Sequence, residues 1–345
     1  MNIEKKQVLE KWTEFTLSND FGMSVNVLDF GGIITRIMTP DRNGNFENIV
    51  LGYSNYQDYQ SNPNYFGALI GRVAGRIEGA SFKLNEKTYS LAANNEDHHL
   101  HGGPSGFHQI LWEVSLFQTA EEVGLTLTHK SADMDGGYPG NVEIKVTYTL
   151  NNHNQLILEY AAKSDQTTPL TLTNHAYFNL SGNLKNTVHD HQVTIDSSRF
   201  VELDTELIPT GKLLDVADTT FDFRGGRVLS DGFNNDFEQN KIADGGYDHY
   251  FIFDHTEEYQ AILQDPVSGR VMLVKTNEPG MVMYTSNGLA EGLPLAKGTS
   301  RKYLGVCFET QASPASLHHE GFPTVILDAG ENYQKQTVFT FRLED

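Results

Sequence analysis

Cysteine is almost absent from this chain, which has one among 345 residues, Cys307. A single thiol cannot close a disulfide within the chain or form a cysteine-based zinc site. Long apolar runs are also missing, since no stretch approaches the roughly 18 apolar residues of a membrane-spanning helix. The first twelve residues, MNIEKKQVLEKW, hold no apolar core like that of a signal peptide. These absences predict a cytoplasmic protein without a membrane partner.

Positive charge is scarce as well. Lysine and arginine number 25 against 45 aspartates and glutamates, which gives a formal net charge of −20. An acidic surface repels phosphate backbones and anionic lipid headgroups, so neither nucleic acid nor membrane is expected as a partner. A neutral small-molecule ligand is the natural default, although the same charge is explained equally well by solubility alone.

Helical periodicity is weak throughout the chain. Only NYQDYQ (55–60) and SDGFNNDF (230–237) could each hold a helical turn or two. No glycine-rich loop follows a strand and opens a long helix, which argues against a Rossmann domain and a P-loop. Long alternation of strands with helices is missing too, which argues against a TIM barrel.

The chain is instead rich in short alternating runs that are separated by turn residues. Apolar and polar positions alternate at period two, the pattern of a strand with one side inward, in SVNVLDF (24–30), VEIKVTYTL (142–150) and TVFTFRL (337–343). Further strands are expected at LILEYAA (156–162) and VMLVKT (271–276). No linker, repeat or composition shift divides the chain. We therefore expect one all-β domain, residues 1–345, of large antiparallel sheets packed face to face with few short helices.

Two segments place titratable residues among glycines. GRVAGRIEGA (71–80) holds Arg72 and Arg76, and a guanidinium there could either fork onto ligand hydroxyls or satisfy a buried loop carbonyl. HHLHGGPSGFH (98–108) begins with two histidines that we interpret as exposed loop residues, namely His98 and His99. The third, His101, precedes two glycines and is interpreted as an imidazole held at a tight turn. No HExxH motif or carboxylate triad accompanies these histidines, so no metal is expected.

A third segment, LTNHAYFNLSG (172–182), places His175 in a core-like run. A buried histidine must be hydrogen-bonded, and the amides of Asn174 and Asn179 are candidate partners. The alternative is a functional imidazole with a shifted pKa that donates or accepts a proton.

The fourth segment, YLGVCFETQASP (303–314), places Glu309 in a mostly apolar, strand-like run. Desolvation raises the pKa of a carboxylate toward neutrality, which suits a general base, whereas a structural ion pair is the alternative. GGYDHYF (245–251) adds Asp248 and His249 in a similar apolar setting.

These segments together resemble the aldose 1-epimerases, also called galactose mutarotases. The matching motifs, in chain order from about residue 30 to the C-terminus, are NYFGALIGRVAGRI, LHGG, GYPG, TNHAYFNL, YDHYF and CFETQ. The resemblance implies a large antiparallel β-sandwich with an open sugar cleft. It also implies an enzyme that interconverts the α and β anomers of an aldohexose such as D-galactose or D-glucose, with no metal and no nucleotide.

The resemblance assigns three catalytic residues. Glu309 of FETQ takes the general-base position and His175 of TNHAYFNL the general-acid position. His101 of LHGG takes the position of a second histidine that helps to hold the region of the ring oxygen. To act as the acid, His175 must be largely protonated in the working complex, which a nearby carboxylate would favour.

The resemblance also implies sugar contacts from Arg76, Asp248 and Tyr284. The first two match residues that grip sugar hydroxyls, and Tyr284 falls where the family often has an aromatic ring. Two positions depart from the family pattern. Gly75 stands where some relatives have asparagine, and Val282 stands where a variant of the PGVQF segment has glutamine. Both departures leave the preferred aldose open.

Three other functions remain open. A glycoside hydrolase would use a carboxylate pair such as Glu309 and Asp248. A non-catalytic sugar-binding module would need aromatic platforms but no matched acid and base. A phosphosugar epimerase would need a basic cluster, and only Arg72 and Arg76 are obvious. The sequence is compatible with a monomer or a homodimer.

Overall fold

The computed structural model describes residues 1–255 and 259–344. Within these ranges almost every regular element is a β-strand, and the one α-helix is the short α1 (Glu238–Ile242). No helix in the described ranges is long and apolar enough to cross a bilayer. The all-β prediction is therefore confirmed.

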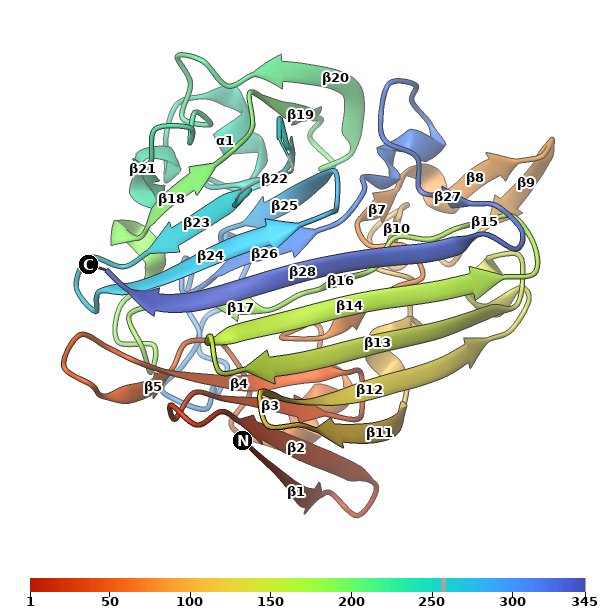
Figure 1. Ribbon diagram of the computed structural model, residues 1–345. Helices are drawn as coiled ribbons and strands as arrows, with labels where there is room; N and C mark the ends of the chain where they lie inside the picture. Colours follow the sequence, from red (N-terminus) through yellow and green to blue (C-terminus); the bar gives the residue numbers. More distant parts are fainter. Residues whose placement is uncertain (256–258, 345) are drawn as a thin grey trace.

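The largest sheet has nine antiparallel strands and forms the front layer in Figure 1. In spatial order its strands are β11 (Glu113–Gln118), β12 (Glu122–Ser131), β13 (Val142–Asn151), β14 (Gln155–Ser164), β28 (Asn332–Leu343), β24 (Arg270–Thr276), β23 (Ala261–Gln264), β18 (Gln192–Ile195) and β21 (Arg227–Val228). The C-terminal strand β28 lies between β14 and β24, so the end of the chain completes the middle of the sheet. Four runs predicted as strands lie in β13, β14, β24 and β28, which confirms them.

A six-stranded sheet lies behind the first and carries much of the site. Its strands, in spatial order, are β17 (Tyr177–Phe178), β26 (Val306–Thr310), β25 (Gly280–Tyr284), β22 (Asp248–Ile252), β19 (Arg199–Leu203) and β20 (Pro209–Asp215). The rings of Phe178 and Phe339 lie 5.3 Å apart across the two sheets, and Thr310 Oγ1 is 2.6 Å from Thr337 Oγ1. These contacts pack the two sheets face to face, as the sequence predicts.

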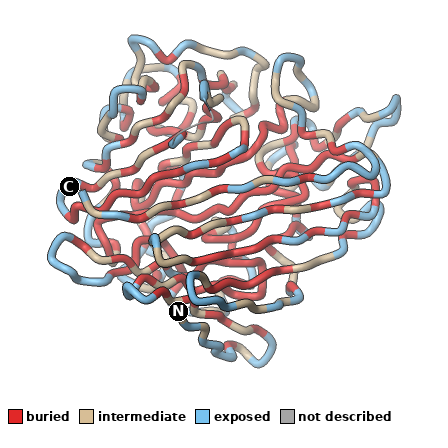
Figure 2. The backbone as a smooth tube through the Cα atoms, viewed as in Figure 1, coloured by how far each residue is buried: buried red, intermediate tan, exposed pale blue. Residues whose placement is uncertain are grey.

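A third sheet is formed by the N-terminal strands β1 (Asn2–Val8), β2 (Trp12–Ser18), β3 (Ser24–Leu28), β4 (Ile33–Pro40) and β5 (Phe46–Asn48). The strand predicted at residues 24–30 begins where β3 begins, but β3 ends two residues earlier than predicted. One continuous core joins all three sheets, with members that include Leu17, Leu125 and Met281. Figure 2 shows the buried residues running along the strands, while the turns are mostly exposed.

Four pairs of short strands lie outside the three large sheets. The paired segments are β6 (Leu69–Ile70) with β16 (Thr173–Asn174), β7 (Arg76–Ile77) with β10 (His99–Leu100), β8 (Ser81–Leu84) with β9 (Lys87–Ser90), and β15 (Thr168–Pro169) with β27 (Ile326–Leu327). The predicted helical turn at 55–60 is the 3-10 helix Tyr56–Gln60, capped by Asn55. The prediction at 230–237 is only partly right, because a 3-10 turn ends at Gly232 and α1 begins at Glu238.

Candidate active site

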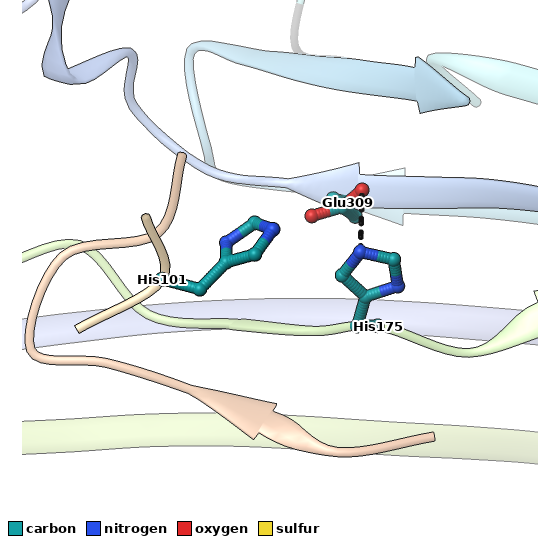
Figure 3. A group of neighbouring side chains, drawn as sticks. All are labelled: His101, His175 and Glu309. Carbon is teal, nitrogen blue, oxygen red and sulfur yellow. Dashed lines mark ion pairs between the residues drawn. The ribbon is translucent and has the colours of Figure 1, made fainter. Parts of the chain in front are cut away.

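A cleft of about 290 Å³ opens on the six-stranded sheet. Its lining includes all six side chains for which the sequence predicts a site role, namely Arg76, His101, His175, Asp248, Tyr284 and Glu309. They come from segments that are far apart in the chain. Figure 3 shows how three of them, His101, His175 and Glu309, face one another.

The floor of the cleft follows from strand register. Glu309 in β26 lies opposite Val282 in β25, which lies opposite Tyr250 in β22. Asp248 and Tyr284 form the adjacent cross-strand pair. Because side chains two residues apart on a strand share a face, these five residues point to the same side of the sheet, and all five line the cleft.

The backbone of His175 is fixed by hydrogen bonds to residues 67 and 68. Its N–H donates to Ala68 O at 2.9 Å, and its carbonyl accepts from Gly67 N at 3.0 Å. The side chain is 4% exposed. Neither neighbouring amide serves it, because Asn174 Nδ2 donates to Gly67 O and Asn179 Nδ2 donates to Leu304 O. The interpretation of His175 as a core histidine bound by those amides is therefore wrong.

The imidazole of His175 faces a carboxyl group instead. Its Nε2 lies 3.5 Å from Glu309 Oε1 (Figure 3), and its Nδ1 lies 3.6 Å from Cys307 Sγ. Glu309 is 3% exposed, so both members of the pair are out of bulk water. At 3.5 Å a small shift makes a hydrogen bond, and the two groups can exchange or share one proton.

Burial sets the charge states of this pair. It raises the pKa of Glu309 well above its ordinary value, with a further rise from the negative charge of Asp248 and an opposing effect of Arg76. Burial lowers the pKa of His175 to about 4. The imidazole is therefore neutral at pH 7 in the ligand-free site. The expectation of a largely protonated His175 concerns the working complex, so it stays a prediction, and desolvation is the main cause of the neutral ring in the ligand-free site.

His101 lies at a tight turn, as predicted, with φ of +53° followed by left-handed glycines at 102 and 103. Its Nδ1 accepts a hydrogen bond from Gly75 N at 3.1 Å. Burial lowers the pKa of His101 well below its ordinary value. Its ring meets that of His175 nearly edge to face, with centroids 5.2 Å apart.

The spacing of His101, His175 and Glu309 is compatible with a metal ion, since each offers a ligand atom within 4.8 Å of the others. A metal-bound histidine donates its second ring N–H to an acceptor. The second ring nitrogen of His101 meets an N–H donor instead, that of Gly75. Its proton must therefore sit on Nε2, the atom that would have to bind the ion. The residues do not fit a metal centre.

The two arginines of the glycine-rich segment have different environments. Arg72 is buried and donates to Ser131 Oγ at 2.9 Å, Pro139 O at 2.9 Å and Ala132 O at 2.6 Å. It therefore satisfies buried loop groups and is a structural residue. Arg76 lines the cleft.

Arg76 is oriented by two acceptors. Its Nε donates to Asn95 Oδ1 at 2.9 Å, and its Nη1 lies 3.4 Å from Asp248 Oδ2. Burial raises the pKa of Asp248, and the charge of Arg76 opposes that rise. Tyr284 Oη accepts from Gly288 N at 3.1 Å. A cation, a carboxyl group and a phenol thus line the same cleft, and each can hydrogen-bond a hydroxyl group.

His98 and His99 are buried, so the interpretation as exposed loop residues is wrong. His98 Nδ1 accepts from Gly79 N at 3.1 Å, and His99 Nδ1 lies 2.7 Å from Ala92 O. Backbone partners hold both rings inside, away from the cleft lining. His249 is buried too, with Nε2 3.1 Å from Gln239 Oε1, and it also lies outside that lining.

Tyr65 and Gln311 line the cleft, although sequence reasoning gave neither a role. Tyr65 has φ of +55°, rare for an aromatic residue, and its ring contacts those of His101 and His175. Gln311 Nε2 donates to Ala74 O at 3.0 Å, while its Oε1 has no partner within the described chain. The signal for Gln311 was its place two residues after Glu309, on the same face.

Comparison with known proteins agrees with this geometry. The family model described as aldose 1-epimerase matches residues 13–340. Human galactose mutarotase is 38% identical over 95% of this chain and 93% of its own, and Streptococcus thermophilus aldose 1-epimerase is 33% identical over 95% and 94%. The crystal structure of galactose 1-epimerase from Lactobacillus acidophilus NCFM superimposes with a TM-score of 0.87 at 29% identity, over 100% of this chain and 99% of that one. The chain belongs to the aldose 1-epimerase family.

Proposed function

We propose that the protein is an aldose 1-epimerase that interconverts the α and β anomers of aldohexoses such as D-galactose and D-glucose. The observation that carries the proposal is the 3.5 Å approach of His175 Nε2 to Glu309 Oε1 in the lining of the cleft. Anomer exchange needs one group that takes a proton and one that gives a proton at neighbouring oxygens. A buried pair that shares one proton supplies both.

In the proposed mechanism, Glu309 removes the proton from the C1 hydroxyl while His175 protonates the ring oxygen O5. The electrons of the O1–H bond form the C1=O1 double bond, and the C1–O5 bond breaks to give the open-chain aldehyde. Rotation about C1–C2 presents the other face of the carbonyl, and reclosure returns both protons. The pair holds the same number of protons before and after, so the chemistry needs no cofactor.

The pair must hold one proton in total for this cycle. The raised pKa of Glu309 and the lowered pKa of His175 favour the form with that proton on Glu309. Transfer to His175 across the 3.5 Å gap gives the carboxylate and imidazolium that begin the reaction. Arg76 lowers the pKa of Glu309, which favours the carboxylate, and also lowers the pKa of His175, which disfavours the imidazolium.

Arg76, Asp248 and Tyr284 are proposed to bind the sugar hydroxyls and one face of the ring. Gly75 and Val282 also line the cleft. Val282 lies directly opposite Glu309 and has no side-chain hydrogen-bond donor. A glutamine there would add a contact, so this position is proposed to affect the preference among hexoses.

Polarimetry tests the proposal directly. The optical rotation of freshly dissolved α-D-galactose or α-D-glucose should reach its equilibrium value faster when the protein is present. The added rate should be proportional to the protein concentration. An unchanged rate would indicate a non-catalytic sugar-binding module. Release of reducing sugar from aryl glycosides would instead favour a glycoside hydrolase that uses Glu309 and Asp248, although Asp248 is already engaged by Arg76.

Three broader features are also proposals. A single domain is supported by the core cluster that runs from Phe15 to Phe341. A cytoplasmic location is supported by the single, buried cysteine. A monomer or a homodimer is proposed as the assembly.

A further inference from the structure

The backbone of one cleft residue, Gly75, holds His101 by two hydrogen bonds. Gly75 N donates to His101 Nδ1 at 3.1 Å, and His101 N donates to Gly75 O at 3.1 Å. The first bond reaches the ring and the second fixes the turn from which the ring projects. Neither the family motif nor any role assigned above gives Gly75 a part in the reaction.

The first of these bonds fixes the tautomer of His101. A backbone amide can only donate, so Nδ1 must accept and carries no proton. The single ring proton of the neutral imidazole therefore sits on Nε2. A proton on Nδ1 as well would set two N–H groups against each other at 3.1 Å. Burial acts in the same direction, since it lowers the pKa of His101.

Nε2 is the nitrogen that faces the reacting groups. Figure 3 shows the ring of His101 with its Nε2 directed toward Glu309 and His175, while Nδ1 lies on the other side. All three residues line the same cleft. The N–H of His101 is therefore aimed at the space in which the C1–O5 bond would lie.

We propose that Gly75 is a positioning residue that holds His101 as a permanently neutral Nε2–H donor. This inference rests on the proposed function. During ring opening, His101 donates a hydrogen bond to the sugar oxygen that gains negative charge, and it keeps its own proton throughout. The transferred protons stay between the sugar and the pair of Glu309 and His175. A neutral imidazole that polarises a substrate oxygen is an established catalytic device.

Position 75 favours glycine for a conformational and steric reason. Its φ is +91°, a left-handed conformation. A Cβ there would lie 3.0 Å from Pro314 Cγ and 3.4 Å from Gln311 Nε2. Aspartate and asparagine tolerate left-handed backbone better than alanine does. The direction of the Gly75 N–H, and with it the tautomer of His101, depends on this conformation.

Nitrogen-15 NMR of the histidine side chains tests the tautomer without any activity. The His101 signals are identified by their loss in His101→Gln. A proton on Nε2, none on Nδ1 and no titration between pH 5 and pH 9 are expected. A proton on Nδ1, or a ring that titrates in that range, would overturn the proposal. Because this readout needs no substrate, its failure is distinct from an absence of mutarotation in the wild type, which would remove the proposed function alone.

Two matched variants of His101 test the catalytic part. Glutamine can place an amide N–H near the position of Nε2, whereas the shorter asparagine can accept from Gly75 but cannot reach into the cleft. If His101 only donates a hydrogen bond, His101→Gln should keep at least tenfold more kcat than His101→Asn. It should also keep the wild-type pH profile. Equal losses in both variants would assign proton transfer to His101 and contradict the proposal.

A second pair of variants tests Gly75 itself. Gly75→Asn and Gly75→Ala both add a Cβ, but only asparagine tolerates the left-handed backbone. We expect Gly75→Ala to lower kcat at least fivefold more than Gly75→Asn does, and KM to change less than threefold in both variants. The nitrogen-15 signals of His101 should be altered in Gly75→Ala. A purely structural role would lower the melting temperature and leave the remaining folded enzyme with wild-type kcat and unchanged His101 signals.

Discussion

His175 Nε2 lies 3.5 Å from Glu309 Oε1, and both side chains are almost fully buried. The two residues come from different parts of the chain, one from the loop between β16 and β17 and the other from β26. Burial destabilises the charged form of each, so the pair is poised to hold one proton between them.

Replacement of His175 by asparagine should mainly affect turnover. Without the imidazole no group delivers a proton to O5, and kcat should fall by roughly 10²–10⁴-fold, the usual contribution of a positioned acid. The sugar contacts of Arg76 and Asp248 remain, so KM should change little. Steady-state polarimetry on α-D-galactose measures both constants. A pure rise in KM would reassign His175 to binding.

The alkaline limit of activity should depend on Asp248. As pH rises through the raised pKa of Glu309, the pair loses its only proton, and kcat/KM should fall. The charge of Asp248 contributes to that raised pKa. Asp248→Asn should therefore lower the pKa of Glu309 and move the alkaline limb of the kcat/KM profile to lower pH.

Glu143→Gln serves as the control for this shift, because Glu143 is exposed and pairs with Lys130 outside the cleft lining. Its pH profile should match that of the wild type. An alkaline limb that stays in place or moves upward in Asp248→Asn would contradict the account.

The two arginines of GRVAGR should give opposite results. Arg72→Met removes donors from two buried groups, Ser131 Oγ and the carbonyl of Pro139. Since each unsatisfied buried group costs about 1–3 kcal/mol, the free energy of unfolding should fall by about 3 kcal/mol or more, with KM unchanged. Arg76→Met should instead raise KM at least about tenfold, as loss of a charged hydrogen bond does, with little change in stability. Urea denaturation measures the stability and polarimetry measures KM. A stable Arg72→Met with a raised KM, or an unstable Arg76→Met with an unchanged KM, would contradict these assignments.

His249 should make stability depend on pH. Burial lowers its pKa to about 3 in the folded protein. The unfolded chain therefore binds the extra proton first, and the stabilisation is lost as pH falls below about 6.5. The stability difference between wild type and His249→Gln should shift against the wild type by about 2 kcal/mol between pH 7 and pH 5. A constant difference in urea unfolding would show that His249 is not protonated on unfolding.

Alternation in the sequence was enough to predict the central strands, because a period of two fixes which side of β13 or β28 faces the core. The family motifs were enough to predict six of the residues that line the cleft. Neither the alternation nor the motifs could predict the 3.5 Å distance between His175 and Glu309, because that distance depends on the packing of segments distant in sequence. Arg72 and Arg76 share one motif, and only their contacts separate a structural from a cleft residue. The burial of His98 and His99 could not be predicted either, because the backbone groups that hold their rings belong to Gly79 and Ala92, and only the fold brings these to the rings.

The central claim, that Glu309 is the base that removes the C1 proton, is tested most directly by the kcat of Glu309→Gln on fresh α-D-galactose. Glutamine keeps the shape of the side chain but cannot take the proton. We expect a loss of kcat of roughly 10²–10⁴-fold in a protein that remains folded. A folded Glu309→Gln enzyme with near wild-type kcat would contradict it.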